Sequence, residues 1–264
     1  MTNIFLNYPE FIDSDTRTAW KSNTAGHYTV SAEFQYHRHR VALPPEQIKN
    51  RRVLDLGCLN AATGAWCLAA GVASYTGVEL QHEFVSVART NLHRYFDGNW
   101  QILQQSFSDF FKTNRDKYDV VVGYGIMHGE LDTHQLLANI AQLDAEIVAL
   151  DSKKPPLITH RLLELGLAPD VIDQIDRLSL IELFDFGMLS AKAGNEKYQH
   201  KSALATSAAV IDIMNHWGYG NYTDHTMTLR KYFPDVYTGR YSINFTKQTS
   251  TCQNFETVYN QANK

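Results

Sequence analysis

The chain has 264 residues, a formal net charge of −4, 44% hydrophobic residues and 20% charged residues. This length allows one large α/β domain with an insertion or two small domains, and the negative charge excludes a general attraction to phosphate backbones. The three cysteines are odd in number and form no C-x-x-C pair, which is typical of a reduced, cytosolic protein. We expect neither a signal peptide nor a membrane span, because no run approaches ~20 apolar residues.

A polar and aromatic leader, residues 1–50, precedes the first strand. Helical spacing predicts one helix near Ser31–Leu43, which Pro44 and Pro45 end. From Arg52 onward, five apolar strands alternate with amphipathic helices, which predicts a parallel, doubly wound α/β sheet. The predicted strands are Val53–Leu56, Ser74–Val78, Trp100–Leu103, Asp119–Val122 and Glu146–Leu150, and the predicted helices are Thr63–Ala70, His82–Tyr95 and His134–Leu143.

The alternation stops after residue 154. Pro155 and Pro156 open a stretch in which Leu157–Leu165 and Pro169–Leu189 have helical spacing, so residues 155–201 are predicted to form a helical insertion. One more helix, two strands and a polar tail follow. They are Ser202–Trp217, Asn221–Leu229, Arg240–Thr246 and residues 248–264, with Pro234 in the turn between the two strands.

The most informative segment is Val53–Cys58, a short apolar strand that runs into a small-residue turn and then a helix. In an α/β sheet this arrangement presents backbone N–H groups to a ligand. Glu79 closes the next strand, and its separation from Asp55 is close to the ~20 residues expected between such a turn and an acid that binds ribose hydroxyls. The sequence therefore predicts an adenosine-containing cofactor at the carboxyl ends of the strands.

These motifs, in this order, resemble those of the class I S-adenosylmethionine-dependent methyltransferases over residues 52–151 and 202–246. The resemblance extends to the third-strand end at Gln105–Asp109 and to Tyr118–Val122, which runs into Gly123–His128. It implies a Rossmann-like, seven-stranded doubly wound sheet whose last strand is antiparallel, and S-adenosylmethionine as the cofactor. The methyltransferase domain would comprise residues 51–154 and 202–247, with the leader as a cover and residues 155–201 as a helical lid.

The first-strand motif departs from the family pattern, which is acidic-x-Gly-x-Gly-x-Gly. Asp55 and Gly57 match it, but Leu59 and Ala61 replace later glycines that normally let the methionine part of the cofactor approach the backbone. This departure bears on the path that the backbone takes through the turn, and less on the identity of the cofactor. A dehydrogenase that uses NAD would need these glycines more, for its pyrophosphate.

The resemblance also implies which residues lie at the cofactor. Asp55 and Gly57 would flank its amino acid part, and Cys58 lies in the same turn, where its expected role is packing. Glu79 would bind the ribose. At the adenine end the implied contacts are Leu80, Ser106 and Phe107, and at the end of the fourth strand they are Gly123 and Tyr124.

A more distant similarity connects the chain with the tRNA wobble-uridine carboxymethyl-transferring enzymes. Their fourth strand ends in a pattern comparable with Gly125–Gly129, and they carry a long insertion after strand five. Before the first strand they have a lysine that could meet an extra carboxylate on the cofactor, and Gln35–Arg38 lacks it. We therefore expect plain S-adenosylmethionine here.

Methyl transfer mainly requires alignment of nucleophile, methyl and sulfur with water excluded, and a nucleophile that carries a proton also needs a base. His128 follows the fourth strand and is the candidate for base or substrate hydrogen-bond partner; the alternative is a histidine that caps the loop. Tyr36 and Arg38 of the leader helix and Arg240 of the last strand are candidates for substrate binding. The alternatives are a solvated basic face and an exposed arginine at a strand start.

On the leader helix, Tyr36, His39 and Arg40 would share a face, while His37 and Arg38 point elsewhere. No metal is expected, because the histidines lack cysteine or carboxylate partners at zinc-site spacings. The leading hypothesis is methyl transfer to oxygen or nitrogen of a small molecule. The alternatives are an RNA-modifying methyltransferase, whose affinity would fall steeply with salt, and a non-catalytic binding protein that keeps the cofactor fold. The oligomeric state is left open.

Overall fold

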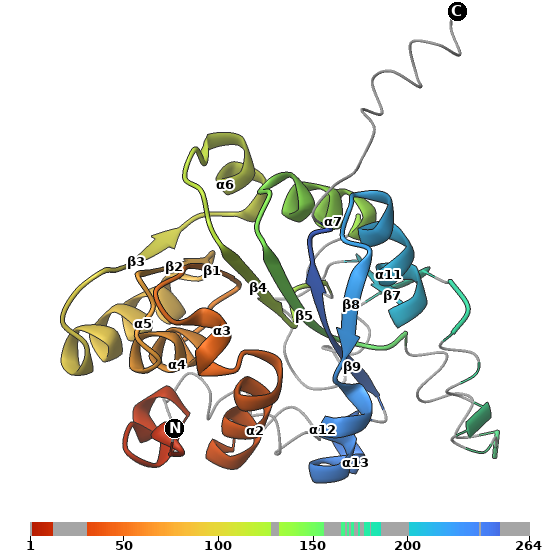
Figure 1. Ribbon diagram of the computed structural model, residues 1–264, viewed down its shortest axis with the longest axis horizontal. Helices are drawn as coiled ribbons and strands as arrows, with labels where there is room; N and C mark the ends of the chain where they lie inside the picture. Colours follow the sequence, from red (N-terminus) through yellow and green to blue (C-terminus); the bar gives the residue numbers. More distant parts are fainter. Residues whose placement is uncertain are drawn as a thin grey trace, which may run out of the picture.

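The computed structural model describes residues 2–12, 31–127, 132–155, 181–185, 201–237 and 239–248, with isolated positions between 165 and 179. Its centre is a seven-stranded sheet in the order β3-β2-β1-β4-β5-β9-β8 (Figure 1). The strands are β1 (Arg52–Leu56), β2 (Ser74–Glu79), β3 (Trp100–Gln104), β4 (Val120–Tyr124), β5 (Ile147–Lys153), β8 (Asn221–Asp224) and β9 (Arg240–Thr246). Neighbouring strands from β3 to β5 are parallel, whereas β9 runs antiparallel to both β5 and β8. The predicted fold class is thus confirmed.

Helices cover both faces of the sheet, and a hydrophobic core lies on each (Figure 1). One face carries α6 (Phe107–Thr113), α7 (Thr133–Gln142) and α11 (Ser207–His216). The other carries the leader with η1 (Ile4–Leu6), η2 (Pro9–Phe11), α2 (Ala32–Ala42) and α3 (Pro45–Ile48), followed by α4 (Ala62–Ala69) and α5 (His82–Tyr95). The strands β1, β2, β4 and β5 are almost entirely buried because both faces are covered, which is typical of parallel sheets, whereas the outer strands β3 and β8 are more exposed.

Side-chain caps set where several of these helices begin. Ser31, Ser106, Asp132 and Thr206 each accept a hydrogen bond from the backbone N–H three residues on, at the starts of α2, α6, α7 and α11. Such a cap satisfies one of the free N–H groups of the first turn, and it contributes about 1 kcal/mol. The predicted helix boundaries accordingly differ from the observed ones by a residue or two.

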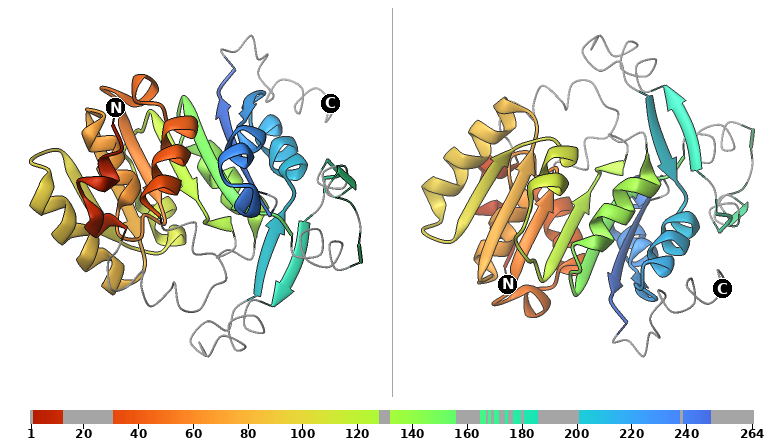
Figure 2. Two further views of the ribbon diagram at one scale, coloured as in Figure 1. Left: turned by 90° about the horizontal axis from the view of Figure 1, so that it is seen from below. Right: turned by 90° about the horizontal axis from the view of Figure 1, so that it is seen from above.

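Two predictions after strand five are wrong in part. The start of the predicted helix Ser202–Trp217 belongs instead to strand β7 (Lys201–Ala205). It pairs antiparallel with β6 (Ile181–Asp185), which lies inside the stretch predicted to be helical. Pairing between the two strands satisfies their backbone groups and outweighs the weak helical preference of residues such as Ala and Leu. Figure 2 shows this hairpin beyond the carboxyl ends of the parallel strands.

The predicted strand Asn221–Leu229 ends at Asp224 and continues as helix α12 (Thr226–Tyr232), which α13 (Pro234–Tyr237) follows. The Asp224 carboxylate accepts a hydrogen bond from the Thr226 N–H at 2.8 Å, which turns the chain out of the sheet. The helix then buries Leu229 in a small cluster with Phe34 of α2 and Tyr237. Packing against residues distant in the sequence therefore determines that residues 226–232 form a helix and not a strand.

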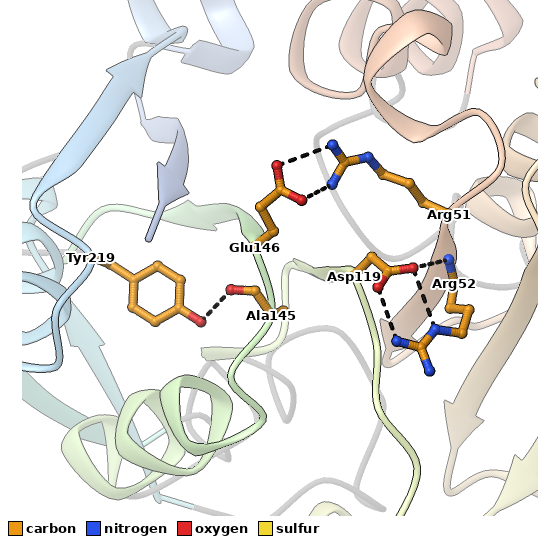
Figure 3. A network of polar contacts seen from close by, with 6 residues as sticks. All are labelled: Arg51, Arg52, Asp119, Ala145, Glu146 and Tyr219. Atoms are coloured by element: carbon orange, nitrogen blue, oxygen red, sulfur yellow. Dashed lines mark hydrogen bonds and ion pairs between the residues drawn. The ribbon is translucent and has the colours of Figure 1, made fainter. Parts of the chain in front are cut away.

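Ion pairs close the amino-terminal edge of the sheet (Figure 3). The Arg51 guanidinium donates to both carboxylate oxygens of Glu146, and Arg52 donates to Asp119 from its backbone and its side chain. These contacts tie the starts of β1, β4 and β5 together. Within the described ranges, no helix is long and apolar enough to cross a membrane.

Candidate active site

The loop after β1 keeps a strongly curved path although two family glycines are replaced. Gly57, Leu59 and Ala61 have φ values of 69°, 48° and 62°, in the left-handed region. For a residue other than glycine this conformation costs about 1–2 kcal/mol. The turn is held from the neighbouring strand, because the N–H groups of Gly57 and Cys58 both donate to the Val78 carbonyl. The loop therefore keeps a left-handed backbone at Leu59 and Ala61, although these residues are not glycine.

Glu79, at the end of β2, holds the same loop through its side chain. Its carboxylate accepts hydrogen bonds from the N–H groups of Leu59 (3.1 Å), Leu80 (2.8 Å) and Gln81 (2.9 Å). Burial raises the pKa of the carboxyl, and the three backbone donors oppose that shift. The Glu79 oxygen that meets Leu59 has a further lone pair for a ribose hydroxyl. Glu79 is thus both the predicted ribose ligand and a clamp on the loop, a second role that the sequence did not reveal.

The side chains beyond Glu79 fit an adenine ring. Leu80 leaves 63% of its surface exposed, directly after the buried Glu79, where a flat apolar ligand would cover it. At the end of β3, the Gln105 amide oxygen is buried and has no hydrogen-bond partner, which suits the amino group of an adenine. Ser106 instead uses its hydroxyl to cap α6 and to contact Asp109 at 2.8 Å. Phe107, the first residue of α6, is partly buried. The motif comparison includes Gln105 in the third-strand end but gives it no role.

Asp55 lies beneath the loop rather than on its surface. It is 2% exposed, and its carboxylate accepts a hydrogen bond from the Tyr75 hydroxyl at 2.7 Å. Burial raises the pKa of Asp55 to about 7, while Tyr75 and the nearby Arg38 guanidinium act in the opposite direction. Asp55 therefore carries only part of its charge at neutral pH. Cys58 is also buried, and its sulfur packs where a side chain on Gly77 would be, as its predicted packing role requires.

Arg38 of α2 reaches across to the end of β4. Its guanidinium carbon lies 4.5 Å from the centre of the Tyr124 ring, a cation–π contact, and it donates to the Gln35 amide oxygen at 2.6 Å. Arg38 is 9% exposed, and its Nε has no hydrogen-bond partner. The interpretation of a solvated basic face is therefore wrong for Arg38. Gly123 faces the core instead, because Ile126 and Leu150 fill the space beside its Cα.

The other leader-helix candidates lie away from Arg38. Tyr36 contacts Trp66 edge-on, with ring centres 6.1 Å apart, and accepts a weak hydrogen bond from Arg40. His37 stacks on Tyr232 of α12 at 4.3 Å. His39 is fully buried, with its ring nitrogens on the Gln35 carbonyl and the Thr63 hydroxyl. These contacts make His37 and His39 packing residues. The His39 ring also contacts Tyr124, with ring centres 5.7 Å apart, while the Arg38 guanidinium lies over the Tyr124 ring and acts on the pKa of Asp55.

Arg240 is also buried, at the junction of β5 and β9. Its guanidinium donates to Asp151 Oδ1 through Nε at 3.0 Å and through a terminal nitrogen, and the Tyr237 hydroxyl donates to Asp151 Oδ2 at 2.7 Å. Arg38 and Arg240 both act on the pKa of Tyr237, which burial raises well above its usual range. The structure thus brings together two of the three predicted substrate-binding residues and leaves Tyr36 apart.

The predicted base, His128, lies outside the described residues, as does most of the insertion. Within the described ranges, no group of three or more His, Cys, Asp or Glu side chains could hold a metal ion. The functional candidates missed from the sequence are Tyr75, Gln105, Asp151 and Tyr237. All four are polar side chains at or near the end of a strand. This feature identifies them as site residues only when the strand order, and hence their neighbours in space, is known.

Comparisons with known proteins agree with this geometry. Residues 54–163 match the family model described as a methyltransferase domain, and no protein of curated function matches the chain. The chain is similar to an S-adenosylmethionine-dependent methyltransferase structure from Listeria monocytogenes (15% identity, TM-score 0.56, covering 83% of this chain and 100% of that one). A second such structure, from Mesorhizobium loti, has 11% sequence identity and a TM-score of 0.55, and the match covers 81% of this chain and 98% of that one. The structure of magnesium protoporphyrin IX methyltransferase from Synechocystis has 13% sequence identity and a TM-score of 0.51, and the match covers 93% of this chain and 100% of that one.

The solved structures establish a shared fold, and the family model establishes the methyltransferase domain. Together they confirm the resemblance to the class I S-adenosylmethionine-dependent methyltransferases inferred from the sequence. The matched methyltransferase domain supports an S-adenosylmethionine-dependent methyltransferase with S-adenosylmethionine as its cofactor. The cofactor also fits the residues present, because the positive-φ loop, the unpartnered Gln105 oxygen and the exposed Leu80 lie at the ends of adjacent strands.

Proposed function

We propose that the protein transfers the methyl group of S-adenosylmethionine to an oxygen or nitrogen of a small molecule. The observation that carries the proposal is the order of side chains along the carboxyl ends of the strands: Gln105 directly after β3, Glu79 at the end of β2, the loop after β1, and Tyr124 at the end of β4, beneath the Arg38 guanidinium. An adenosine at Gln105 and Glu79 would direct the amino acid part of the cofactor toward Asp55 and Arg38.

In this proposal Glu79 binds the ribose hydroxyls, and Gln105 accepts a hydrogen bond from the adenine amino group. The Arg38 Nε, buried and without a partner, binds the carboxylate of the methionine part. The cofactor supplies an activated methyl group on a sulfonium, so the protein's task is to align the acceptor and exclude water. His128 remains the candidate base, and comparing turnover with cofactor affinity in His128→Ala tests that role when an acceptor is known.

A small acceptor is favoured over RNA by the burial of the cations at the site. Arg38 and Arg240 are largely shielded from solvent, where a phosphate backbone would not reach them. The net charge of −4 points the same way. Binding of total tRNA at low ionic strength, falling steeply as salt is added, would contradict this choice. The non-catalytic alternative rested on Leu59 and Ala61, and both residues keep the left-handed backbone of the turn.

Isothermal calorimetry with S-adenosylhomocysteine tests the proposal directly. We expect saturable binding by the wild-type protein and a loss of about tenfold to a hundredfold in Arg38→Met, the range for a hydrogen bond to a charged group. Binding of 5′-methylthioadenosine, which lacks the carboxylate, should differ little between the two proteins. Failure of the wild-type protein to bind either nucleoside would overturn the proposal.

A further inference from the structure

A second cation lies beyond Arg38, at the end of β5. Lys153 is the last residue of β5 and pairs in register with Arg240 of β9, while Asp151 pairs with Tyr124 of β4. Because alternate residues of a strand share a face, Asp151, Lys153 and Arg240 all lie on the face that carries Tyr124 and is covered by α2. Lys153 is therefore the cation of β5 on this face, one strand beyond Tyr124 and two residues after Asp151.

The charges at this junction do not balance locally. Both oxygens of Asp151 are engaged, one by Arg240 and the other by the Tyr237 hydroxyl. In the described part of the chain, no hydrogen bond or ion pair joins the partly buried Lys153 ammonium to an acceptor. Its pKa is lowered to about 8 by burial and by the nearby Arg240 guanidinium. A charged ammonium in such a place is stabilised when an anion binds beside it.

Two cations, Arg38 of α2 and Lys153 of β5, lie on the same face of the sheet and could bind two anions. Arg38 lies over Tyr124, next to the cofactor loop, and is assigned above to the carboxylate of the cofactor. Lys153 is one strand further from the proposed nucleoside site, at the carboxyl end of β5, so an anion bound there would belong to the acceptor. Arg240 cannot serve as the second anion site alone, because Asp151 already neutralises it.

We propose that the methyl acceptor carries a carboxylate or phosphate group, and that Lys153 binds this group and so determines substrate specificity. The inference rests on the proposed methyl transfer, and it adds an acidic acceptor class to it. Arg240, Asp151 and Tyr237 act as the rigid support that keeps Lys153 at the end of β5. The ammonium needs no particular geometry from its ligand, so charge rather than shape is recognised.

The test uses the full chain saturated with S-adenosylhomocysteine, with its lysines reductively ¹³C-methylated, which keeps their charge. Acetate and inorganic phosphate are the probes, and the Lys153 resonance is assigned by its loss in Lys153→Arg. We expect a saturable shift of this resonance with at least one probe, and a rise in the pKa of Lys153 at saturation. The exposed Lys112 on α6 is the internal control and should respond linearly and weakly. The probe that saturates distinguishes a carboxylate from a phosphate ligand.

Substitutions give a second readout through anion-induced protection against thermal unfolding. Lys153→Met should weaken the midpoint for the effective anion at least tenfold, whereas Lys153→Arg should stay within a few fold and Lys112→Met should match the wild type. If Lys153 responds no differently from Lys112 while S-adenosylhomocysteine binds, the inference is overturned and the methyl transfer stands. If S-adenosylhomocysteine itself does not bind, the proposed function fails first. If Lys153→Arg loses the anion as fully as Lys153→Met, charge recognition is wrong.

Discussion

The two edges of the sheet, formed by the amino-terminal and the carboxyl-terminal ends of its parallel strands, differ in how their charged residues are paired. At the amino-terminal edge, Arg51 pairs with Glu146 and Arg52 with Asp119 in contact with solvent (Figure 3). At the carboxyl-terminal edge, Arg38, Asp55 and Asp151 are buried, and polar atoms of Arg38, Gln105 and Tyr124 have no partner. The first edge is complete without a ligand. The second is not, and groups that are buried but unsatisfied are costly unless something binds them. The difference identifies the functional edge.

The largest expected effect concerns how the two edges respond to pH. The folded-state pKa of Asp55 is raised to about 7, so the native protein holds a proton that the unfolded chain releases near pH 4. Stability should therefore fall as pH rises from about 4 to 7, by at most ~4 kcal/mol for a three-unit shift. Asp119 behaves oppositely: its Arg52 partner lowers its pKa, so its contribution is lost as pH falls below its usual range.

Urea unfolding followed from below pH 4 up to pH 8 measures both pH dependences. Asp55→Asn, whose amide oxygen can still accept from Tyr75, should remove most of the decline between pH 4 and 7. Asp119→Asn should leave that window unchanged and flatten the curve only at lower pH. An unaltered slope in Asp55→Asn would show that another group is responsible.

The next effect in size is at Gly57. Its φ is 69°, and a Cβ there would lie 2.9 Å from the Ile126 side chain. Backbone strain and the clash together should destabilise Gly57→Ala by about 2–4 kcal/mol. Gly71 is the matched control, because its φ is 80° but a Cβ would meet nothing closer than 4.0 Å. Gly71→Ala should therefore cost only about 1 kcal/mol. Equal losses in chemical denaturation would mean that the loop tolerates a side chain at Gly57.

Glu79→Ala should weaken binding of S-adenosylhomocysteine by about 1.5–3 kcal/mol, the range for hydrogen bonds to a charged group. Because the carboxylate also holds the Leu59 N–H, Glu79→Gln should recover part of the loss through its amide oxygen. Glu146→Ala, at the opposite edge, is the control and should bind with wild-type affinity. Calorimetry measures all three. Unchanged affinity in Glu79→Ala would remove this residue from the ribose site.

The smallest expected effect on stability is at the amino-terminal edge, where the charged side chains are already paired. Arg51 and Glu146 retain 28% and 63% of their side-chain exposure, so their ion pair should contribute less than about 1 kcal/mol. Arg51→Met should lower the free energy of unfolding by that amount at low salt, and by less at 1 M salt, where exposed charges are screened. A loss above 2 kcal/mol that persists in high salt would contradict the contrast between the two edges.

Local pattern determined most of the first half of the fold. The helix His82–Tyr95 and the strand Arg240–Thr246 have the predicted bounds, and the parallel pairing from β3 to β5 agrees with the alternation of strands and helices. The pattern failed at Lys201–Ala205 and Thr226–Tyr232, where a distant partner decided the conformation. A short segment has too few residues for propensity to outweigh pairing or burial.

The sequence by itself predicted a nucleoside site at the loop after the first strand and the acid after the second, and it placed Gly57 and Glu79 in one local βαβ unit, because their spacing is set within that unit. Only the tertiary structure decided what lies around them. Arg38 reaches Tyr124 from a separate helix, the Tyr75 hydroxyl donates a hydrogen bond to the buried Asp55 carboxylate, and Lys153 pairs in register with Arg240 across antiparallel strands. These contacts join residues far apart in the chain, and burial and charge pairing depend on distances in space that sequence spacing does not encode.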